Sequence, residues 1–194
     1  MKFPQIYLAS GSPRRRELLS QIEVDFSVLS VDVDERRLEG EQPTDYVKRV
    51  AIAKAQAGWD CLANNEKRAV LGSDTSVVLQ DDILGKPVDE QDARLMLQKL
   101  SGKTHQVMTA VALVNGPEVV CELTRNLVTF AQLTEQDIEW YLSTQEGVDK
   151  AGSYAVQGLA ALFIDKIEGS YSAIMGLPLR ETGLLLTQLA GRMK

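Results

Sequence analysis

The stretch Ile6-Tyr7-Leu8-Ala9-Ser10-Gly11-Ser12-Pro13-Arg14-Arg15 decides how the chain begins to fold. Its apolar first part predicts a strand, and the pattern over residues 13–21 predicts a helix. Pro13 suits the first helical position, where its missing N–H has no helical partner, and Ser12 is then the N-cap. The sequence therefore predicts a strand, a tight loop and a helix N-terminus in direct succession.

The same loop carries the residue types of an anion site. Gly11 lets the backbone approach a ligand closely, and Ser10 offers a small hydroxyl. The free N–H groups and the dipole of a helix N-terminus favour an anion, and Arg14 and Arg15 present forked donors that match phosphate oxygens. A capped helix with two solvated arginines is the other interpretation, and this short motif alone does not separate them.

The composition of the chain limits the classes of protein to which it can belong. A chain of 194 residues with 44% hydrophobic residues is typical of a soluble globular protein, and we expect a single domain over residues 1–194. The net charge of −6 argues against a general nucleic-acid binder, which needs a broad basic surface. No run approaches the roughly 18 apolar residues of a membrane span, and the N-terminus lacks a signal-peptide core, so we expect a cytoplasmic protein that binds no membrane. Cys61 and Cys121 are expected to be packing residues.

A lysine lies in the middle of a predicted apolar helix face. Thr44 is expected to cap a helix that runs to about Gly58, with Val47 and Val50 on its apolar side. Lys54 falls on that same face. Its ammonium must either reach past the apolar surface to water or contact an anion in a cleft.

An aspartate interrupts a predicted apolar strand over residues 69–79. Aspartate is depleted from strand interiors and is expensive to bury as a charge, so Asp74 must be paired, hydrated or bound to a metal. Gly72 and Ser73 beside it leave room for a ligand. We therefore favour a functional Asp74 over a structural one.

Other polar residues are less distinctive. The acidic run 32–35 either holds a hard cation such as Mg²⁺ or is a solvated loop, and the second interpretation is favoured from the run alone. Lys86 belongs to a loop near the Asp74 strand, and His105, the only histidine, is interpreted as structural. Asp89 and Thr134 are expected to cap helices.

The element order predicts an α/β fold. A β-α-β unit followed by β-hairpins implies a mixed sheet flanked by helices, with two lobes and a cleft between them. A late hairpin is expected around residues 163–169. Leu184, Leu185 and Leu189 are expected to form the apolar side of a C-terminal helix that Pro178 opens.

Eight short motifs in order carry a resemblance over nearly the whole chain. Together they resemble the Maf family of nucleotide pyrophosphatases. They are Ala9-Ser10-Gly11-Ser12-Pro13-Arg14-Arg15, Asp34-Glu35, Lys54-Ala55, Leu71-Gly72-Ser73-Asp74-Thr75, Gly85-Lys86-Pro87, Ser101-Gly102, Lys150-Ala151-Gly152 and Gly176-Leu177-Pro178-Leu179.

The resemblance implies an enzyme that splits a nucleoside triphosphate into the monophosphate and pyrophosphate, with a divalent cation, Mg²⁺ or Mn²⁺, as cofactor. It implies an elongated, strongly twisted mixed sheet with a deep cleft, as in inosine-triphosphatase-like enzymes. Asp74 would be the catalytic base or a metal-linked carboxylate, and Glu35 would help to hold the metal. The residues implied to hold the phosphates are Ser10, Arg14, Arg15, Lys54 and Lys86.

Three positions resemble the branch that acts on dTTP and UTP. The branch that acts on 7-methyl-GTP typically has Trp, Gln and Glu where this chain has Arg14, Thr75 and Gln157. The amide of Gln157 offers both donors and an acceptor, which suits it to read a pyrimidine edge. We therefore expect Thr75 and Gln157 to contact substrate, in a house-cleaning enzyme that family resemblance suggests is a homodimer.

A different class of function is the alternative. The same loop in a non-catalytic regulator, for example of cell division, would bind a nucleotide as a signal. Asp74 favours the enzyme, because a regulator has no need of a carboxylate inside an apolar strand. The absence of a Ser-His-acid or Cys-His pattern favours direct attack by water over a covalent intermediate.

Overall fold

The computed structural model describes residues 3–64 and 67–192 of the chain. The chain divides into two compact units. The first comprises residues 1–74, 109–124 and 176–194, and the second comprises residues 75–108 and 125–175. The prediction of a single domain over residues 1–194 stays a prediction.

Within the described residues, the strands form one mixed sheet of seven strands in the order β2-β1-β3-β5-β6-β7, with β4 paired to β3. Strand β1 pairs parallel with β2 and β3, whereas β4 and β7 pair antiparallel with β3 and β6. The predicted mixed α/β sheet is therefore confirmed. The strands are β1 Ile6–Leu8, β2 Phe26–Val28, β3 Val70–Leu79, β4 Asp82–Leu84, β5 Thr104–Asn115, β6 Glu118–Phe130 and β7 Ile164–Glu168.

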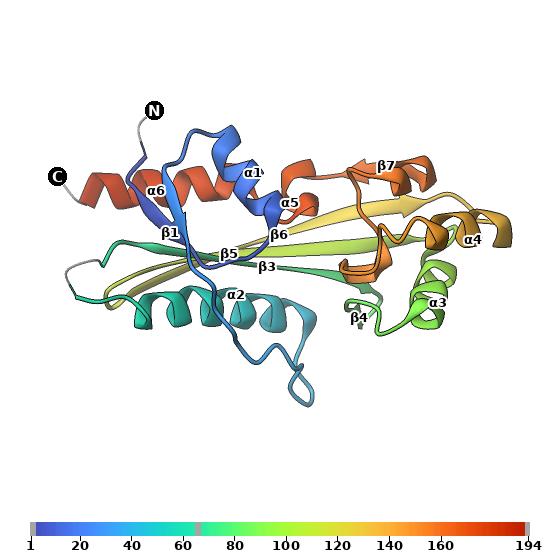
Figure 1. The fold of residues 1–194 in the computed structure, drawn as a ribbon, viewed down its shortest axis with the longest axis horizontal. Helices are drawn as coiled ribbons and strands as arrows, with labels where there is room; N and C mark the ends of the chain where they lie inside the picture. The colour runs from blue at the N-terminus through green and yellow to red at the C-terminus, as the bar shows by residue number, and fades with distance from the viewer. Residues whose placement is uncertain (1–2, 65–66, 193–194) are drawn as a thin grey trace. The chain divides into compact units, whose positions relative to one another are not determined.

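Three helices cover the strands of the first unit. Helix α2 (Pro43–Asp60) lies on one side of β1 and β3, whereas α1 (Pro13–Gln21) and α6 (Leu179–Arg192) lie on the other side (Figure 1). The predicted succession of strand, tight loop and helix at the N-terminus is confirmed, with Ser12 as the N-cap of α1.

A glycine sets how closely α2 approaches β3. A Cβ atom at Gly72 would lie 2.4 Å from the carbonyl oxygen of Ala51 and 2.6 Å from the backbone nitrogen of Ala55. Only a residue without a side chain allows this contact between the strand and the helix backbone. Because side chains alternate along a strand, Asp74 points to the same face as Gly72, toward α2.

The second unit has its own apolar core. Its helices are α3 Glu90–Leu100, α4 Glu135–Ser143, η1 Ala151–Ser153, η2 Leu159–Phe163 and α5 Tyr171–Met175. Leu97, Phe130 and Tyr141 are among the buried side chains that form the core. Asp89 accepts the backbone N–H of Asp92, and Thr134 forms a capping box with Asp137, so both predicted helix caps are confirmed.

The only histidine belongs to this core. His105 is 2% exposed, its Nε2 lies 2.8 Å from the hydroxyl of Tyr154, and its ring meets Phe130 and Tyr154 edge to face. Burial lowers the pKa of His105 to about 4, so the ring is neutral at pH 7. The structural interpretation of His105 is confirmed.

Several local predictions are wrong. The N-cap of α2 is Gln42 rather than Thr44, because Pro43 takes the first helical position. In α6, Leu185 and Leu189 are buried as predicted, whereas Leu184 is half exposed and Leu186 is buried in its place. Cys61 follows the end of α2 and is exposed rather than packed.

The predicted late hairpin is also wrong. Strand β7 pairs with the distant strand β6, so that Val128 lies opposite Ile167, and the chain then enters α5. The apolar residues of this segment reflect burial against a distant strand, which a local pattern does not distinguish from a hairpin.

No helix in residues 3–64 and 67–192 has the length and apolar character needed to cross a membrane.

Replacing Gly72 by alanine tests the close contact of α2 and β3. We expect Gly72→Ala to lower the free energy of unfolding by about 1–3 kcal/mol, because the new methyl group meets backbone atoms that cannot rotate away. Urea unfolding followed by circular dichroism measures this loss. Gly191→Ala in α6 is the control, since its Cβ would meet nothing within 4 Å. Equal stability of the Gly72 variant and the wild type would contradict the packing argument.

Acid pH tests the buried histidine. The folded-state pKa of about 4 lies below the ordinary 6.5, so between these values the unfolded chain takes up a proton that the folded chain excludes. Stability from this residue is therefore fully present above pH 6.5 and is lost as the pH falls toward 4. From pH 7 to pH 4.5, urea unfolding should show the wild type losing about 2 kcal/mol more than His105→Gln. An identical loss in both proteins would rule out this origin of the acid sensitivity.

Candidate active site

An ion pair joins α2 to β3 in the first unit. The Nζ atom of Lys54 lies 2.8 Å from Oδ1 of Asp74, and the two side chains are 13% and 9% exposed. The pairing follows from the Gly72 contact, because Lys54 precedes Ala55 along the helix and Asp74 lies two residues beyond Gly72 on the same strand face. Lys54 therefore contacts a carboxylate of the chain itself, and Asp74 is paired.

A second carboxylate reaches the same ammonium. Oε1 of Glu35 lies 2.9 Å from Nζ of Lys54, and the Glu35 side chain is about half exposed. Glu35 comes from residues 29–42, which connect β2 to α2 without a helix or strand. Lys54 therefore brings together two of the predicted site carboxylates, Glu35 and Asp74.

The N-terminal loop is held by its own arginine. Arg15 donates from Nη1 to the hydroxyl of Ser10 at 3.0 Å and from Nε to the carbonyl of Gly176 at 2.8 Å. The Ser10 hydroxyl also accepts the backbone N–H of Ser12 at 3.3 Å. Ser12 itself makes no side-chain cap to α1, so Ser10 is the residue that orders the turn.

The arginines of this loop lie in a partly buried, charged environment. Burial is the largest cause that lowers the pKa of both Arg14 and Arg15. The negative charge of Asp74 and, less strongly, of Glu35 opposes this for Arg15, whereas Arg14 adds to the lowering. The predicted phosphate-binding arginines and the predicted metal carboxylates therefore influence each other electrostatically.

The carboxylate pair fits the chemistry of a hard divalent cation. Glu35 and Asp74 already converge on one cation, the Lys54 ammonium, which stands in for a positive charge at this point. Mg²⁺ is commonly bound through one or two carboxylates together with waters and substrate phosphates, so a pair of carboxylates is an adequate protein contribution. Within residues 3–64 and 67–192, no three His, Cys, Asp or Glu side chains lie together so that they could bind a metal ion as a group.

The remaining predicted site residues belong to the second unit. Thr75 lies two residues before Val77 and Lys86 two residues after Leu84, and Val77 pairs with Leu84. Thr75 and Lys86 therefore lie toward the same end of the β3–β4 ladder, and Lys86 is exposed. Gln157 is also exposed. That these three residues act together with the first-unit residues stays a prediction.

The segment that carries Gln157 is anchored by Glu146. Its carboxylate accepts the hydroxyl of Tyr141 at 2.9 Å and the backbone N–H groups of Leu159 at 2.9 Å and Ala160 at 3.3 Å. A Cβ at Gly158 would lie 2.2 Å from the same carboxylate, so a side chain at residue 158 would displace the Glu146 carboxylate. Gln157 is thus an exposed amide on a rigidly attached segment.

The family comparison decides the relationship of this chain to known proteins. The family model described as Maf-like protein matches residues 5–189. The chain belongs to the Maf-like protein family.

Curated relatives of this Maf-like chain share about half of its residues. The chain is 52% identical over 186 residues to a protein of Pseudoalteromonas atlantica, a match that covers 95% of this chain and 97% of the relative. It is 51% identical over 188 residues to a protein of Shewanella sp., covering 94% and 97%. Both relatives are named dTTP/UTP pyrophosphatase.

A solved structure shares the fold. The Maf-like chain is similar to the Ham1 protein of Staphylococcus aureus, with a TM-score of 0.52, 15% identity, and coverage of 97% of this chain and 100% of that one. This likeness confirms the predicted inosine-triphosphatase-like α/β fold.

Sequence reasoning missed the role of a backbone carbonyl in the Maf-like site. The carbonyl of Gly176 accepts Nε of Arg15 at 2.8 Å and the hydroxyl of Ser73 at 3.0 Å. It ties α1 and β3 to the segment before α6. The signal was present only as the motif that begins at Gly176, which assigned the residue no function.

Sequence reasoning also did not single out Tyr46, whose phenol is influenced by two of the predicted site carboxylates. Burial and then the charges of Asp74 and Glu35 raise the pKa of Tyr46 to about 12, so its phenol stays protonated at neutral pH. Tyr46 and Lys54 lie eight residues apart on α2, and the shared helix face was the available signal.

Proposed function

We propose that the chain is a nucleoside triphosphate pyrophosphatase that hydrolyses dTTP and UTP to the monophosphate and pyrophosphate, in a house-cleaning role. The observation that carries the substrate assignment is the 52% identity, over nearly the full length of both chains, to a relative named dTTP/UTP pyrophosphatase. The Lys54–Asp74–Glu35 cluster supports the chemistry, because it combines a cation with carboxylates that are able to hold a metal and accept a proton.

The N-terminal loop would bind the phosphates. Arg14, Arg15 and the N-terminus of α1 would donate hydrogen bonds to phosphate oxygens, and the Ser10 hydroxyl keeps Arg15 oriented for this contact. Lys54 and Lys86 would add positive charge, which matters because negative charge develops on the leaving pyrophosphate. Binding and orientation of the triphosphate are thus assigned mainly to the positively charged side chains.

Asp74 would act as the general base. A water molecule would attack one phosphorus atom of the α–β anhydride. A new P–O bond would form at this atom as its bond to the bridging oxygen breaks, and Asp74 would accept the proton of the water. The products are then the nucleoside monophosphate and pyrophosphate, and no covalent enzyme intermediate is needed. Lys54 holds Oδ1 of Asp74 and so fixes the orientation of the carboxylate.

Glu35 and Asp74 would hold a divalent cation, Mg²⁺ or Mn²⁺, together with the substrate phosphates. Such a cation, when bound, neutralises phosphate charge and polarises the reacting P–O bond. Lys54 would hold the two carboxylates at one point when the substrate is absent.

Base selection is assigned to exposed polar groups. Gln157 would hydrogen-bond a pyrimidine edge, and Thr75 and Arg14 would complete the preference for dTTP and UTP. The rigid attachment of the Gln157 segment through Glu146 supports a discriminating role, since a hydrogen bond selects best from a fixed position. The cytoplasmic location and the homodimer stay predictions.

A substrate panel tests the proposed activity. Purified protein is incubated with dTTP, UTP and 7-methyl-GTP in the presence of Mg²⁺ or Mn²⁺, and pyrophosphate and monophosphate are measured. We expect pyrophosphate from dTTP and UTP, little from 7-methyl-GTP, and no release after chelation of the metal. Tight binding of dTTP without turnover would favour the regulator instead, and release of orthophosphate would contradict cleavage at the α–β anhydride.

Replacing Asp74 tests the assignment of the base. Asp74→Asn should lower kcat by about 10²–10⁴-fold, because the amide is unable to accept the proton of the attacking water. Urea unfolding should show a folded protein, since the two side chains have the same shape. Asp82→Asn, at an exposed aspartate in the neighbouring strand β4, is the control and should keep the wild-type kcat. A wild-type kcat in the Asp74 variant would remove this residue from its role.

A further inference from the structure

The segment that carries Glu35 has no regular structure of its own. Residues 29–42 run from β2 to α2 without a helix or strand, so side-chain contacts contribute much of what fixes their conformation. The pair between Glu35 and Lys54 is too weak for this task, because the Glu35 side chain is about half exposed and exposed ion pairs contribute little. Another contact must therefore order the segment.

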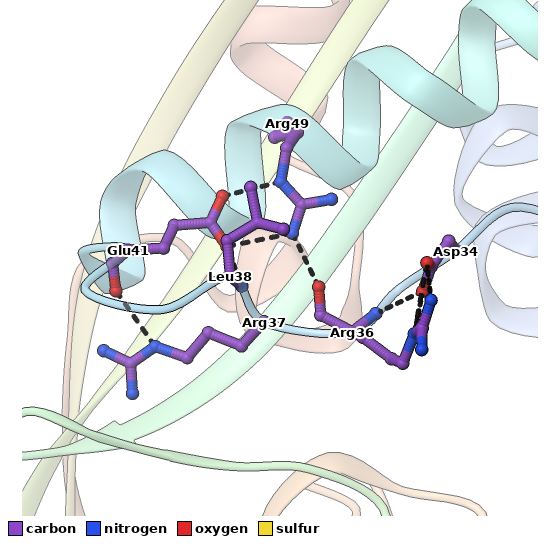
Figure 2. Close-up of polar contacts among 6 residues, drawn as sticks. All are labelled: Asp34, Arg36, Arg37, Leu38, Glu41 and Arg49. Carbon is purple, nitrogen blue, oxygen red and sulfur yellow. Dashed lines mark hydrogen bonds and ion pairs between the residues drawn. The ribbon is translucent and has the colours of Figure 1, made fainter.

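Arg49 on α2 makes that contact. Its Nε lies 2.6 Å from Oε1 of Glu41 and its Nη2 lies 2.9 Å from Oε2, so the guanidinium grips the carboxylate with two parallel hydrogen bonds (Figure 2). The Glu41 side chain is only 8% exposed, although its segment lies at the surface. The hydrogen bonds from Arg49 lower the pKa of Glu41 to about 2, which keeps the carboxylate charged at neutral pH.

The same guanidinium holds the backbone next to Glu35. Nη2 of Arg49 donates to the carbonyl of Arg36 at 3.0 Å. The Glu41 carboxylate in turn accepts the backbone N–H of Leu38 at 3.0 Å, and the Glu41 carbonyl accepts Nε of Arg37 at 2.9 Å (Figure 2). These contacts of Arg49 with Glu41 and with the carbonyl of residue 36 are called the Arg49 clamp below.

Two residues of one helix therefore hold two consecutive residues of the segment. Arg49 binds the carbonyl of Arg36, and Lys54, five residues further along α2, binds the carboxylate of Glu35. Because α2 is rigid, fixing residue 36 on the helix also limits where the Glu35 side chain reaches.

We propose that Arg49 is a positioning residue of the active site, which holds Glu35 beside Lys54 and Asp74 through the clamp on Glu41 and residue 36. This inference rests on the proposed function, in which Glu35 helps to hold the divalent cation. Arg49 itself touches neither substrate nor metal. An arginine is required, because lysine lacks the planar fork that serves a carboxylate and a carbonyl together.

A neighbouring ion pair supplies a matched control. The Arg36 guanidinium binds both oxygens of Asp34, and these side chains are 89% and 60% exposed (Figure 2). Arg36→Ala removes this pair and leaves the backbone carbonyl that the clamp uses. It therefore alters the same segment without altering the Arg49 clamp.

The kinetic test measures metal dependence and a double-mutant cycle. Arg49→Lys and Glu41→Gln should each raise the Mg²⁺ concentration for half-maximal dTTP hydrolysis by about 10-fold or more, as loss of a group that orients a metal ligand does. Arg36→Ala should match the wild type. When Glu35 is already changed to Gln, Arg49→Lys should add less than about a twofold effect, because its influence passes through Glu35. A full, multiplicative effect in that background would overturn the proposal.

Limited proteolysis gives a readout that needs no catalytic activity. Trypsin cleaves after arginine, and the segment contains Arg36 and Arg37. In folded protein, Arg49→Lys and Glu41→Gln should raise the rate of cleavage at these residues by about 10-fold, measured by mass spectrometry, without raising cleavage elsewhere. Arg36→Ala should leave the rate of cleavage after Arg37 unchanged.

The outcomes separate the two proposals. If the wild type releases no pyrophosphate but the clamp variants open the segment to trypsin, the proposed function fails and the ordering by Arg49 stands. If the wild type is active and the clamp variants keep both wild-type metal dependence and wild-type cleavage, Arg49 has no positioning role. Urea unfolding of each variant excludes loss of the whole fold as the cause of faster cleavage.

Discussion

The contact between Gly72 and the backbone of α2 is the constraint on which the candidate site depends. It brings a helix and a strand closer than any side chain at this position allows. The lysine that follows Ala51 by one turn and the aspartate that follows Gly72 by two residues then meet at 2.8 Å. A charged pair of this kind is costly to desolvate, and its retention on an otherwise apolar interface is easier to explain by chemistry than by stability.

Sequence reasoning found the residues that conflict with their surroundings. Asp74 stands in an apolar strand and Lys54 on an apolar helix face, and each conflict has a physical cost that demands a partner. The pattern did not reveal that the two are partners of each other, since they lie twenty residues apart and meet only through the packing of α2 on β3. The fold class followed from the order of strands and helices, whereas the partner of β7 required a pairing with distant β6.

Residues whose role lies in geometry were missed. Arg49 and Glu41 have the appearance of ordinary solvated charges, because nothing in their spacing shows that the connecting segment folds back on α2. Gly176 acts through a carbonyl, a group that every residue possesses, so no residue type signals it. Two helix details failed by small margins: Pro43 begins α2, which makes Gln42 rather than Thr44 the N-cap, and Leu186 rather than Leu184 is buried in α6.

The Gly176 carbonyl links the timing of synthesis to the assembly of the N-terminal loop. Arg15 leaves the ribosome early, yet the acceptor of its Nε lies 161 residues later in the chain. Until that residue emerges, the Nε of Arg15 and the hydroxyl of Ser73 lack this acceptor. The nascent chain therefore carries the loop of residues 10–15, with the contact of Arg15 to Ser10, long before the second contact of Arg15 is available. The N-terminal loop therefore reaches its final arrangement only after almost the whole chain has been synthesised.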